Sequence, residues 1–352
     1  MTTITTEHWG YSPEGEEILR FTLRNAQGSS VCLTNVGAAM VAVRTADSEG
    51  HIDDILLGYR DGESYVGDCA CCGKCVGRVA NRITEGRMKV EGKEYQLEIN
   101  NAPNHLHGGS KGYANLVWQH RIEGESLIFA LHSPNGDQGF PSTVDIEVRY
   151  TFDDDNRLHL HFTGESDGTT PLMMTNHAYW NLSGENSGTI LDHELRLNCS
   201  TAEELNLHHV PTGRIIDIIG TPQDFRTAWR RFGDEIDSEF QNMRTKGGYG
   251  VYYPLDNYRA GELQEVGELR DSKSHRRLRI LTTQRGVMLY TGNKLSIACP
   301  TTKSGTTYCN YAGVALECQG FVDAVNYPQF QDIILHKGER YDEHIVYEIG
   351  IW

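Results

Sequence analysis

Alternation of apolar and polar side chains, with a period of two residues, limits most strongly how this chain can fold. From Val144 to Phe152 every second residue is apolar, residues 153–156 supply turn chemistry, and the alternation resumes from Leu158 to Phe162. Successive side chains on a strand point to opposite faces. The pattern therefore predicts an antiparallel hairpin with one buried face and one solvated face.

Other segments repeat this strand signal, whereas helical periodicity is scarce. Residues 88–97 predict a hairpin that turns near Gly92, and strands are expected at 190–197 and 278–281. The best helical candidate, around residues 227–240, is short and contains a glycine. Short strands joined by turns are typical of a β-sandwich.

The length and the glycine content agree with one large all-β unit. The chain has 352 residues and 37 glycines, and no Pro- or Ser-rich linker divides it. All-β folds often exceed 200 residues as one domain. We therefore expect a single domain over residues 1–352, a large antiparallel β-sandwich.

Charge and hydropathy restrict the partners and the compartment. The chain carries 48 acidic and 32 basic residues, a formal net charge of −16, which argues against nucleic acid or an anionic membrane as a partner. Apolar runs fall short of the ~20 residues that a membrane span needs, and the polar N-terminus lacks a signal-peptide core. A cytoplasmic protein with reduced cysteines is expected.

Two polar segments supply side chains that could hold a ligand. In residues 104–109 two histidines, His105 and His107, flank one apolar residue, so on a strand they would share a face, and paired glycines follow. In residues 77–83 two arginines and an amide occur together, and Arg82 could bond sugar hydroxyls through two donors. A polar loop and a solvated basic turn are the alternatives for these segments.

Two further segments place polar chemistry among apolar residues. Residues 175–182 surround His177 with amides and aromatic rings, and flat rings such as Trp180 stack on the C–H faces of sugars. A strand end with a core tryptophan fits the same composition. In residues 315–321 an acid, Glu317, lies inside an apolar strand and shares a face with Gln319. Because a buried carboxylate is costly unless paired or used, Glu317 is a candidate site residue, unless an edge strand turns it to solvent.

A cysteine-rich run offers a different interpretation. Residues 69–75 contain four thiols, among them a C-x-x-C pair, which raises the hypothesis of a metal- or redox-sensing protein. Zinc sites usually draw their ligands from two pairs separated by a longer spacer, whereas here one short loop would have to surround the ion. Packed thiols in the core are therefore the favoured interpretation.

Taken together, the segments resemble the aldose 1-epimerase (galactose mutarotase) family. The matching pieces occur in the family's order across almost the whole chain. They are GRVANRI at 77–83, NHLHGG at 104–109, NGDQGFP at 135–141, TNHAYWNLSG at 175–184, VPTG at 210–213, DFR at 224–226, YTGN at 290–293 and LECQGFVDAVN at 316–326. The resemblance implies a wide antiparallel sandwich with a sugar cleft.

The resemblance also implies roles for individual residues. His177 matches the family's catalytic acid, Glu317 its catalytic base and His107 its second active-site histidine, while Asn81 and Arg82 match sugar-binding residues. We add Trp180 and Gln319 to the expected substrate-binding set. One carboxylate base and one imidazolium acid suffice to open and reclose a cyclic hemiacetal, so no metal or other cofactor is expected.

One departure from the family affects the residues expected to bind the sugar hydroxyls. The family commonly carries an aspartate that bonds sugar hydroxyls where this chain has Gly250, and Asp256, six residues on, is a candidate replacement. The expected partner is a monosaccharide such as glucose or galactose, and the expected assembly is a monomer or homodimer. A sugar-binding protein of the same fold with weak or lost mutarotase activity is the alternative.

Overall fold

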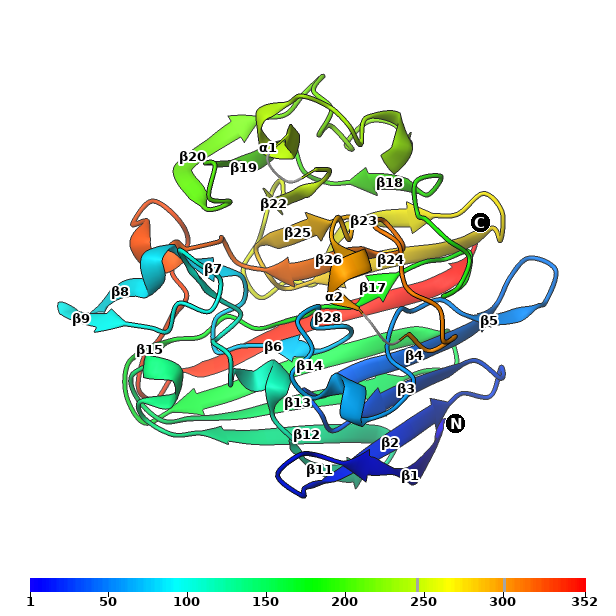
Figure 1. Cartoon of the computed structure of the whole chain (residues 1–352), viewed down its shortest axis with the longest axis horizontal. Coiled ribbons are helices and arrows are strands. Elements are labelled where there is room, and N and C mark those ends of the chain that lie inside the picture. The colour runs from blue at the N-terminus through cyan, green and yellow to red at the C-terminus, as the bar shows by residue number, and fades with distance from the viewer. Residues whose placement is uncertain (245–246, 300–301) are drawn as a thin grey trace.

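One long antiparallel sheet forms the first layer of the molecule. The computed structural model describes residues 1–244, 247–299 and 302–352. This sheet has nine strands in the order β11-β12-β13-β14-β28-β24-β23-β18-β21, and most of them run side by side in Figure 1. Their bounds are β11 Gln119–Glu123, β12 Ser126–Ser133, β13 Val144–Phe152, β14 Arg157–Ser166, β28 Arg340–Ile351, β24 Arg276–Thr282, β23 Gln264–Arg270, β18 Glu194–Leu197 and β21 Arg230–Arg231.

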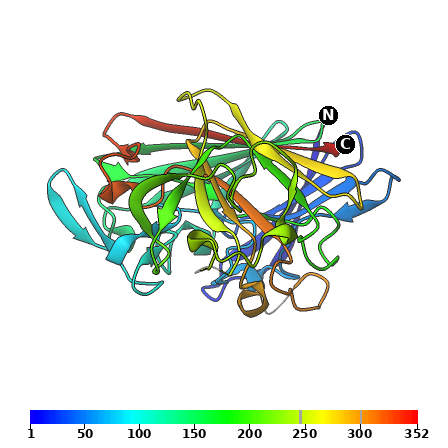
Figure 2. The same cartoon turned by 90° about the horizontal axis from the view of Figure 1, so that it is seen from above.

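Two smaller sheets make up most of the second layer. A five-stranded sheet contains β1 Thr3–Tyr11, β2 Glu17–Arg24, β3 Ser30–Thr34, β4 Ala39–Ala46 and β5 Ile52–Asp54. A four-stranded sheet has the order β17 Tyr179–Trp180, β26 Val314–Gln319, β25 Gly286–Tyr290 and β22 Gly250–Pro254. In the view from above, the short orange helix α2, Leu295–Ala298, lies on the opposite side of the molecule from the red strand β28 (Figure 2).

Short two-stranded ladders accompany these sheets. The ladders are β6 Cys75–Val76 with β16 Thr175–Asn176, β7 Arg82–Ile83 with β10 His105–Leu106, β8 Arg87–Val90 with β9 Lys93–Gln96, β15 Thr170–Pro171 with β27 Ile334–Leu335, and β19 Thr201–Leu205 with β20 Pro211–Asp217. Helix α1, Gln241–Arg244, has four residues, as has α2. Within the described chain, no helix has the length and apolar character to cross a bilayer.

The core lies between the two layers and explains why they pack. Phe21 of β2 meets Phe129 of β12 edge-on, with ring centroids 5.6 Å apart, and Trp180 of β17 meets Tyr347 of β28 at 5.0 Å. All four side chains are buried. Such aromatic pairs add to the stabilisation that burial of apolar area supplies. The predicted all-β sandwich is confirmed.

Most of the predicted strands occur in the structure, and the predicted helix does not. Strands β13 and β14 pair in register, with Phe152 opposite Leu158, and β8 and β9 form the second predicted hairpin. Strand β24 covers 278–281, whereas β18 is shorter than the 190–197 prediction. These outcomes show that period-two alternation located the strands well.

The prediction of a helix around residues 227–240 is wrong. The segment instead contributes the edge strand β21 and a single 3₁₀ turn, Phe232–Asp234. Phe232 is fully buried, and the Arg270 guanidinium stacks on the Trp229 ring at 3.7 Å from its centroid. These long-range contacts hold the backbone against β18 and outweigh its weak helical preference.

Glu343 is an unusual carboxyl in β28, the strand between β14 and β24. Burial raises its pKa to about 7, and the neighbouring charge of Asp342 acts in the same direction, against a hydrogen bond donated by Thr283. Because the folded-state pKa lies above the unfolded value, the folded state binds the proton more tightly. The protonated Glu343 carboxyl therefore stabilises the folded state. This contribution is complete below the pKa that Glu343 has in the unfolded chain, and it is lost as the pH rises through about 7.

We predict that Glu343→Gln stabilises the protein at pH 8 relative to wild type and has little effect at pH 5. The expected gain at pH 8 is on the order of 1–3 kcal/mol, since each pKa unit corresponds to 1.36 kcal/mol. Urea unfolding at both pH values measures it. The exposed carboxyl of Glu165 provides the control, because Glu165→Gln should change stability equally at the two pH values. Equal effects for Glu343→Gln would contradict the prediction.

Candidate active site

A cavity of about 340 Å³ brings together residues that lie far apart in the sequence. Its wall is formed by residues of the 69–71 and 81–82 segments, by His107, by His177 and Tyr179, by residues of the 288–298 segment and by Glu317. The volume falls in the range of small-molecule sites. All four segments singled out in the sequence for polar chemistry therefore contribute to one pocket, together with the Cys69–Cys71 segment.

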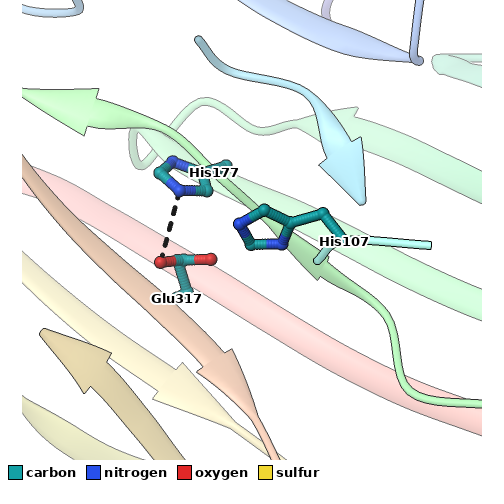
Figure 3. Close-up of side chains that lie close together, drawn as sticks. All are labelled: His107, His177 and Glu317. Carbon is teal, nitrogen blue, oxygen red and sulfur yellow. Dashed lines mark ion pairs between the residues drawn. The ribbon is translucent and has the colours of Figure 1, made fainter. Parts of the chain in front are cut away.

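Glu317 and His177 face each other across the floor of this cavity. Glu317 extends from β26, a strand whose six residues are all buried, and His177 lies between β16 and β17. The His177 Nε2 atom is 3.5 Å from Glu317 Oε1, and the two side chains are 7% and 3% exposed. Figure 3 shows this pair, with His107 beside it. A carboxylate so deeply buried needs such a partner, because its desolvation is otherwise unfavourable.

The backbone of His177 is fixed by the segment that precedes β6. Its N–H donates to the Lys74 carbonyl at 2.8 Å, and its carbonyl accepts from the Gly73 N–H at 2.9 Å. The imidazole ring contacts Tyr179 and His107, with centroid distances of 4.9 and 5.4 Å. Backbone and ring are thus held on several sides, which fixes the direction of Nε2.

A hydrogen bond to the His107 ring determines which nitrogen carries the proton when the ring is neutral. Its Nδ1 atom accepts the backbone N–H of Asn81 at 3.1 Å, so the proton of a neutral ring resides on Nε2. Burial lowers the pKa of His107 well below the ordinary value, and the neighbouring His177 and Arg82 side chains add to that effect. His107 therefore offers the pocket a neutral N–H donor.

His105 does not share a face with His107, contrary to the expectation from their spacing. His105 is fully buried, its Nδ1 lies 2.8 Å from the Glu98 carbonyl, and its ring packs against Phe140. The strand β10 ends at Leu106, and His107 adopts a positive φ of 52°. This backbone turn directs only the second histidine into the cavity.

Asn81 and Arg82 line the cavity. The Asn81 side-chain oxygen accepts the Arg82 N–H at 2.9 Å, and the Arg82 Nε donates to the Asn101 side chain at 3.2 Å. Burial lowers the pKa of Arg82, although a guanidinium keeps its charge at neutral pH. The cavity thus has a cationic donor group close to the buried pair.

Trp180 and Gln319 lie outside the cavity, which corrects their expected role. Trp180 is fully buried in the core, because strand alternation turns it away from the face on which Tyr179 lies. Gln319 is also fully buried, and its amide donates to the Gly320 carbonyl. Neither lines the pocket, so neither is placed to touch a sugar bound there.

Several lining residues escaped the sequence interpretation. Tyr179 and Tyr290 present aromatic rings to the cavity, and Asn293 and His209 add polar groups. Tyr290 and Asn293 belong to the YTGN segment and Tyr179 neighbours His177 in its motif, so these motifs carried a usable signal. No local pattern marked His209, which the fold brings to the cavity from another connection.

Asp256 does not replace the aspartate that the family carries at the position of Gly250. Its carboxylate accepts the backbone N–H and the hydroxyl of Ser200, and it does not line the cavity. Gly250 itself is buried in β22, opposite Tyr290. Among the described residues that line the cavity, Glu317 is the one carboxylate.

Two side-chain groups in the described residues have a spacing suited to a metal ion. The ligand atoms of His107, His177 and Glu317 lie within 4.8 Å of one another, as do those of His161, Asp342 and His344 on the nine-stranded sheet. The first set coincides with the groups that acid–base chemistry would use without a metal.

The cysteine-rich run does not form a ligand set in the described part of the chain. Cys75 turns towards the Tyr150 hydroxyl at 3.2 Å, and Cys72 turns towards Cys299 at 3.6 Å. Cys69 is exposed and donates to the Ala298 carbonyl. Cys75 thus turns away from Cys69 and Cys72, which both approach the 298–299 segment, so the thiols of the run do not converge on one point.

Comparison with known proteins assigns the chain to a family. The model of the family described as aldose 1-epimerase matches residues 20–348. Galactose mutarotase from Rattus norvegicus is 33% identical over 352 residues, covering 100% of both chains. The chain belongs to the aldose 1-epimerase family. Aldose 1-epimerase from Escherichia coli K12 is 31% identical over 344 residues, or 96% of each chain.

Solved structures of the family share the same fold. An aldose epimerase homologue from Caenorhabditis elegans superposes with a TM-score of 0.85 at 28% identity, covering 100% of this chain and 99% of the other. Galactose 1-epimerase from Lactobacillus acidophilus also gives 0.85, at 24% identity and with the same coverage. The family thus accounts for the whole length of the sandwich, not for a part of it.

The two arginines of the 77–83 segment allow a direct test of the pocket. Arg78 is 1% exposed and donates to the carbonyls of Pro141 and Ser142 at 2.7 and 2.9 Å. We predict that Arg78→Met lowers the free energy of unfolding by roughly 2–3 kcal/mol, since these buried acceptors lose a charged donor. Arg82→Met should instead raise KM about tenfold, as expected when a charged ligand hydrogen bond is lost.

Chemical denaturation and steady-state mutarotation assays on both variants separate the two roles. Arg78→Met, where it folds, should retain a KM close to that of wild type. An unchanged KM for Arg82→Met would contradict a role of Arg82 in sugar binding.

Proposed function

We propose that this protein is an aldose 1-epimerase that interconverts the α and β anomers of a monosaccharide, a hexose such as glucose or galactose. In this proposal Glu317 is the general base and His177 the general acid. The observation that carries it is the buried pair of these two side chains, 3.5 Å apart on the floor of the cavity. Membership of the aldose 1-epimerase family supports the same reaction.

The distance between the two groups suits the chemistry of a cyclic hemiacetal. Ring opening removes a proton from the C1 hydroxyl and delivers one to the ring oxygen. Both oxygens are bonded to C1, so an acid and a base that serve them must converge on nearly the same point. His177 Nε2 and Glu317 Oε1 meet this requirement, and a sugar C1 placed against them would contact both.

The reaction then proceeds through an open-chain aldehyde. When the bond between C1 and the ring oxygen breaks, rotation about C1–C2 presents the other face of the carbonyl. Reclosure with reversed proton transfers gives the other anomer. Ring opening leaves Glu317 protonated and His177 neutral. Reclosure restores both groups to their starting protonation, so two residues complete the cycle.

His107 and Arg82 support these transfers without taking part in them. The neutral Nε2–H of His107 can donate to a sugar oxygen, and its neutrality avoids a further positive charge beside the proposed acid His177. Arg82 can hold hydroxyls through its guanidinium donors. Preorganised donors of this kind stabilise charge that develops during the reaction.

Two aromatic side chains and two amides are suited to grip the rest of the sugar. Tyr179 and Tyr290 offer flat faces for C–H groups, while Asn101 and Asn293 line the wall. Position 250, a glycine, offers no carboxylate for the sugar hydroxyls. Weaker discrimination among hydroxyl patterns is the expected consequence, since charged acceptors bind hydroxyls more strongly.

We predict that Glu317→Gln and His177→Asn each lower kcat by 10²–10⁴-fold, roughly the contribution of general acid–base catalysis. The rate at which fresh α-glucose or α-galactose loses its excess optical rotation measures the change. Circular dichroism should show that both variants remain folded. Wild-type protein that fails to accelerate mutarotation of any common aldose would overturn the proposal.

A panel of glucose, galactose, xylose and arabinose tests the substrate class. We predict that the enzyme accelerates several of these sugars and that their kcat/KM values differ by about tenfold or less, as expected when no charged acceptor selects one hydroxyl. Anomer exchange measured by NMR, beside binding measured by calorimetry, provides the check. Binding without exchange would identify a sugar-binding protein instead.

A further inference from the structure

Two cysteines that are distant in the sequence meet beside the active-site cavity. Cys72 Sγ and Cys299 Sγ lie 3.6 Å apart, although 227 positions separate them. Both are fully buried in a cluster that also contains Tyr59 and Leu295. Neither thiol has a part in the proposed proton transfers, so this contact calls for an explanation of its own.

Both cysteines belong to segments that form the wall of the cavity. Cys69 and Cys71, on the segment of Cys72, line it directly, and so do residues of α2, which Cys299 follows. The two segments already touch, because the Cys69 thiol donates to the Ala298 carbonyl at 3.4 Å. A covalent bond between Cys72 and Cys299 would therefore join two sides of the substrate pocket.

The segment that carries Cys72 is also connected to the proposed acid. The backbone groups of Gly73 and Lys74 make both backbone hydrogen bonds of His177. The Asp68 carboxylate, which pairs with the buried Lys74, accepts the N–H of Cys71 at 2.6 Å. Cys72 therefore directly precedes the two residues that hold the backbone of His177.

The surroundings of the two thiols favour Cys299 as the nucleophile. The hydrogen bond from Cys72 lowers the pKa of Cys299, and the Tyr59 hydroxyl 3.5 Å away acts in the same direction. Burial instead raises the pKa of Cys71 to about 12 and that of Cys75 to about 11. Since the thiolate is the reactive form, oxidation should select Cys299 over these two neighbours.

We propose that Cys72 and Cys299 are a thiol-modification site that forms a reversible disulfide and thereby lowers the activity of the adjoining pocket. With hydrogen peroxide as the oxidant, the Cys299 thiolate attacks one peroxide oxygen and becomes a sulfenic acid, while the second oxygen leaves as water. The Cys72 sulfur then attacks the Cys299 sulfur, and the sulfenic oxygen leaves as a second water. Two thiols thus lose two electrons to one peroxide.

Formation of the bond would change the shape of the cavity. The sulfur atoms must approach from 3.6 Å to about 2.05 Å, the length of a disulfide. This approach draws the end of α2 towards the segment that holds His177. Because small displacements of catalytic groups slow reactions strongly, we expect kcat/KM to fall ~10-fold, and dithiothreitol should restore it.

Peptide mapping of the wild-type protein is the first test and does not depend on the proposed function. The full chain is treated with one to a few equivalents of hydrogen peroxide, unreacted thiols are alkylated, and the digest is analysed without reduction. The expected product is a peptide pair linked through Cys72 and Cys299. Oxidation of other cysteines with no such pair would overturn the proposal.

The activity test depends on the mutarotase function and uses three variants. Cys72→Ala and Cys299→Ala should keep their activity after peroxide treatment, whereas Cys309→Ser, which removes an exposed thiol elsewhere, should lose activity like wild type. Equal losses in all the proteins would overturn the regulatory role. If the untreated protein showed no mutarotation at all, the proposed function would fail, while the mapped disulfide would still stand or fall by itself.

Discussion

The burial of one carboxylate is the constraint around which the active-site half of the molecule is arranged. Glu317 lies in β26, between β17 and β25, where every residue of the strand is buried. An isolated carboxylate there would be strongly unfavourable. His177 supplies the partner, and its own position depends on backbone hydrogen bonds to the segment before β6. The pair therefore ties the four-stranded sheet to the loops that form the pocket wall.

Other buried charges hold those loops in place. Arg78 binds backbone carbonyls of the 133–142 connection, and Lys74 pairs with Asp68 below the cavity wall. Arg82, four residues after Arg78, reaches the cavity instead. Neighbouring cations of one short motif thus have different tasks, because the backbone between them turns through Asn81 at a positive φ of 63°. Loop stability and ligand binding can be separated by substitution at these two arginines.

The cysteine-rich segment, residues 69–75, contributes both to the wall of the pocket and to the thiol contact beside it. It contributes Cys69 and Cys71 to the wall, Gly73 and Lys74 to the support of His177, and Cys72 to the contact with Cys299. A disulfide at that contact would act on the backbone that fixes the proposed acid. The proposed proton transfer uses no thiol. Oxidation of Cys72 and Cys299 would therefore shift the position of His177 without changing the groups that transfer protons.

The sequence by itself indicated most of the strands and the three side chains that meet in the cavity. Alternation located β13, β14 and β24, because the side-chain period of a strand is a local property, and family motifs carried His107, His177 and Glu317. Tertiary structure decided the rest. It placed Trp180 in the core, turned His105 away from the cavity, removed the expected helix at 227–240 and brought Cys299 to Cys72. These positions depend on contacts between segments that are distant in the sequence. A local sequence pattern does not encode which distant segment a strand or loop will contact.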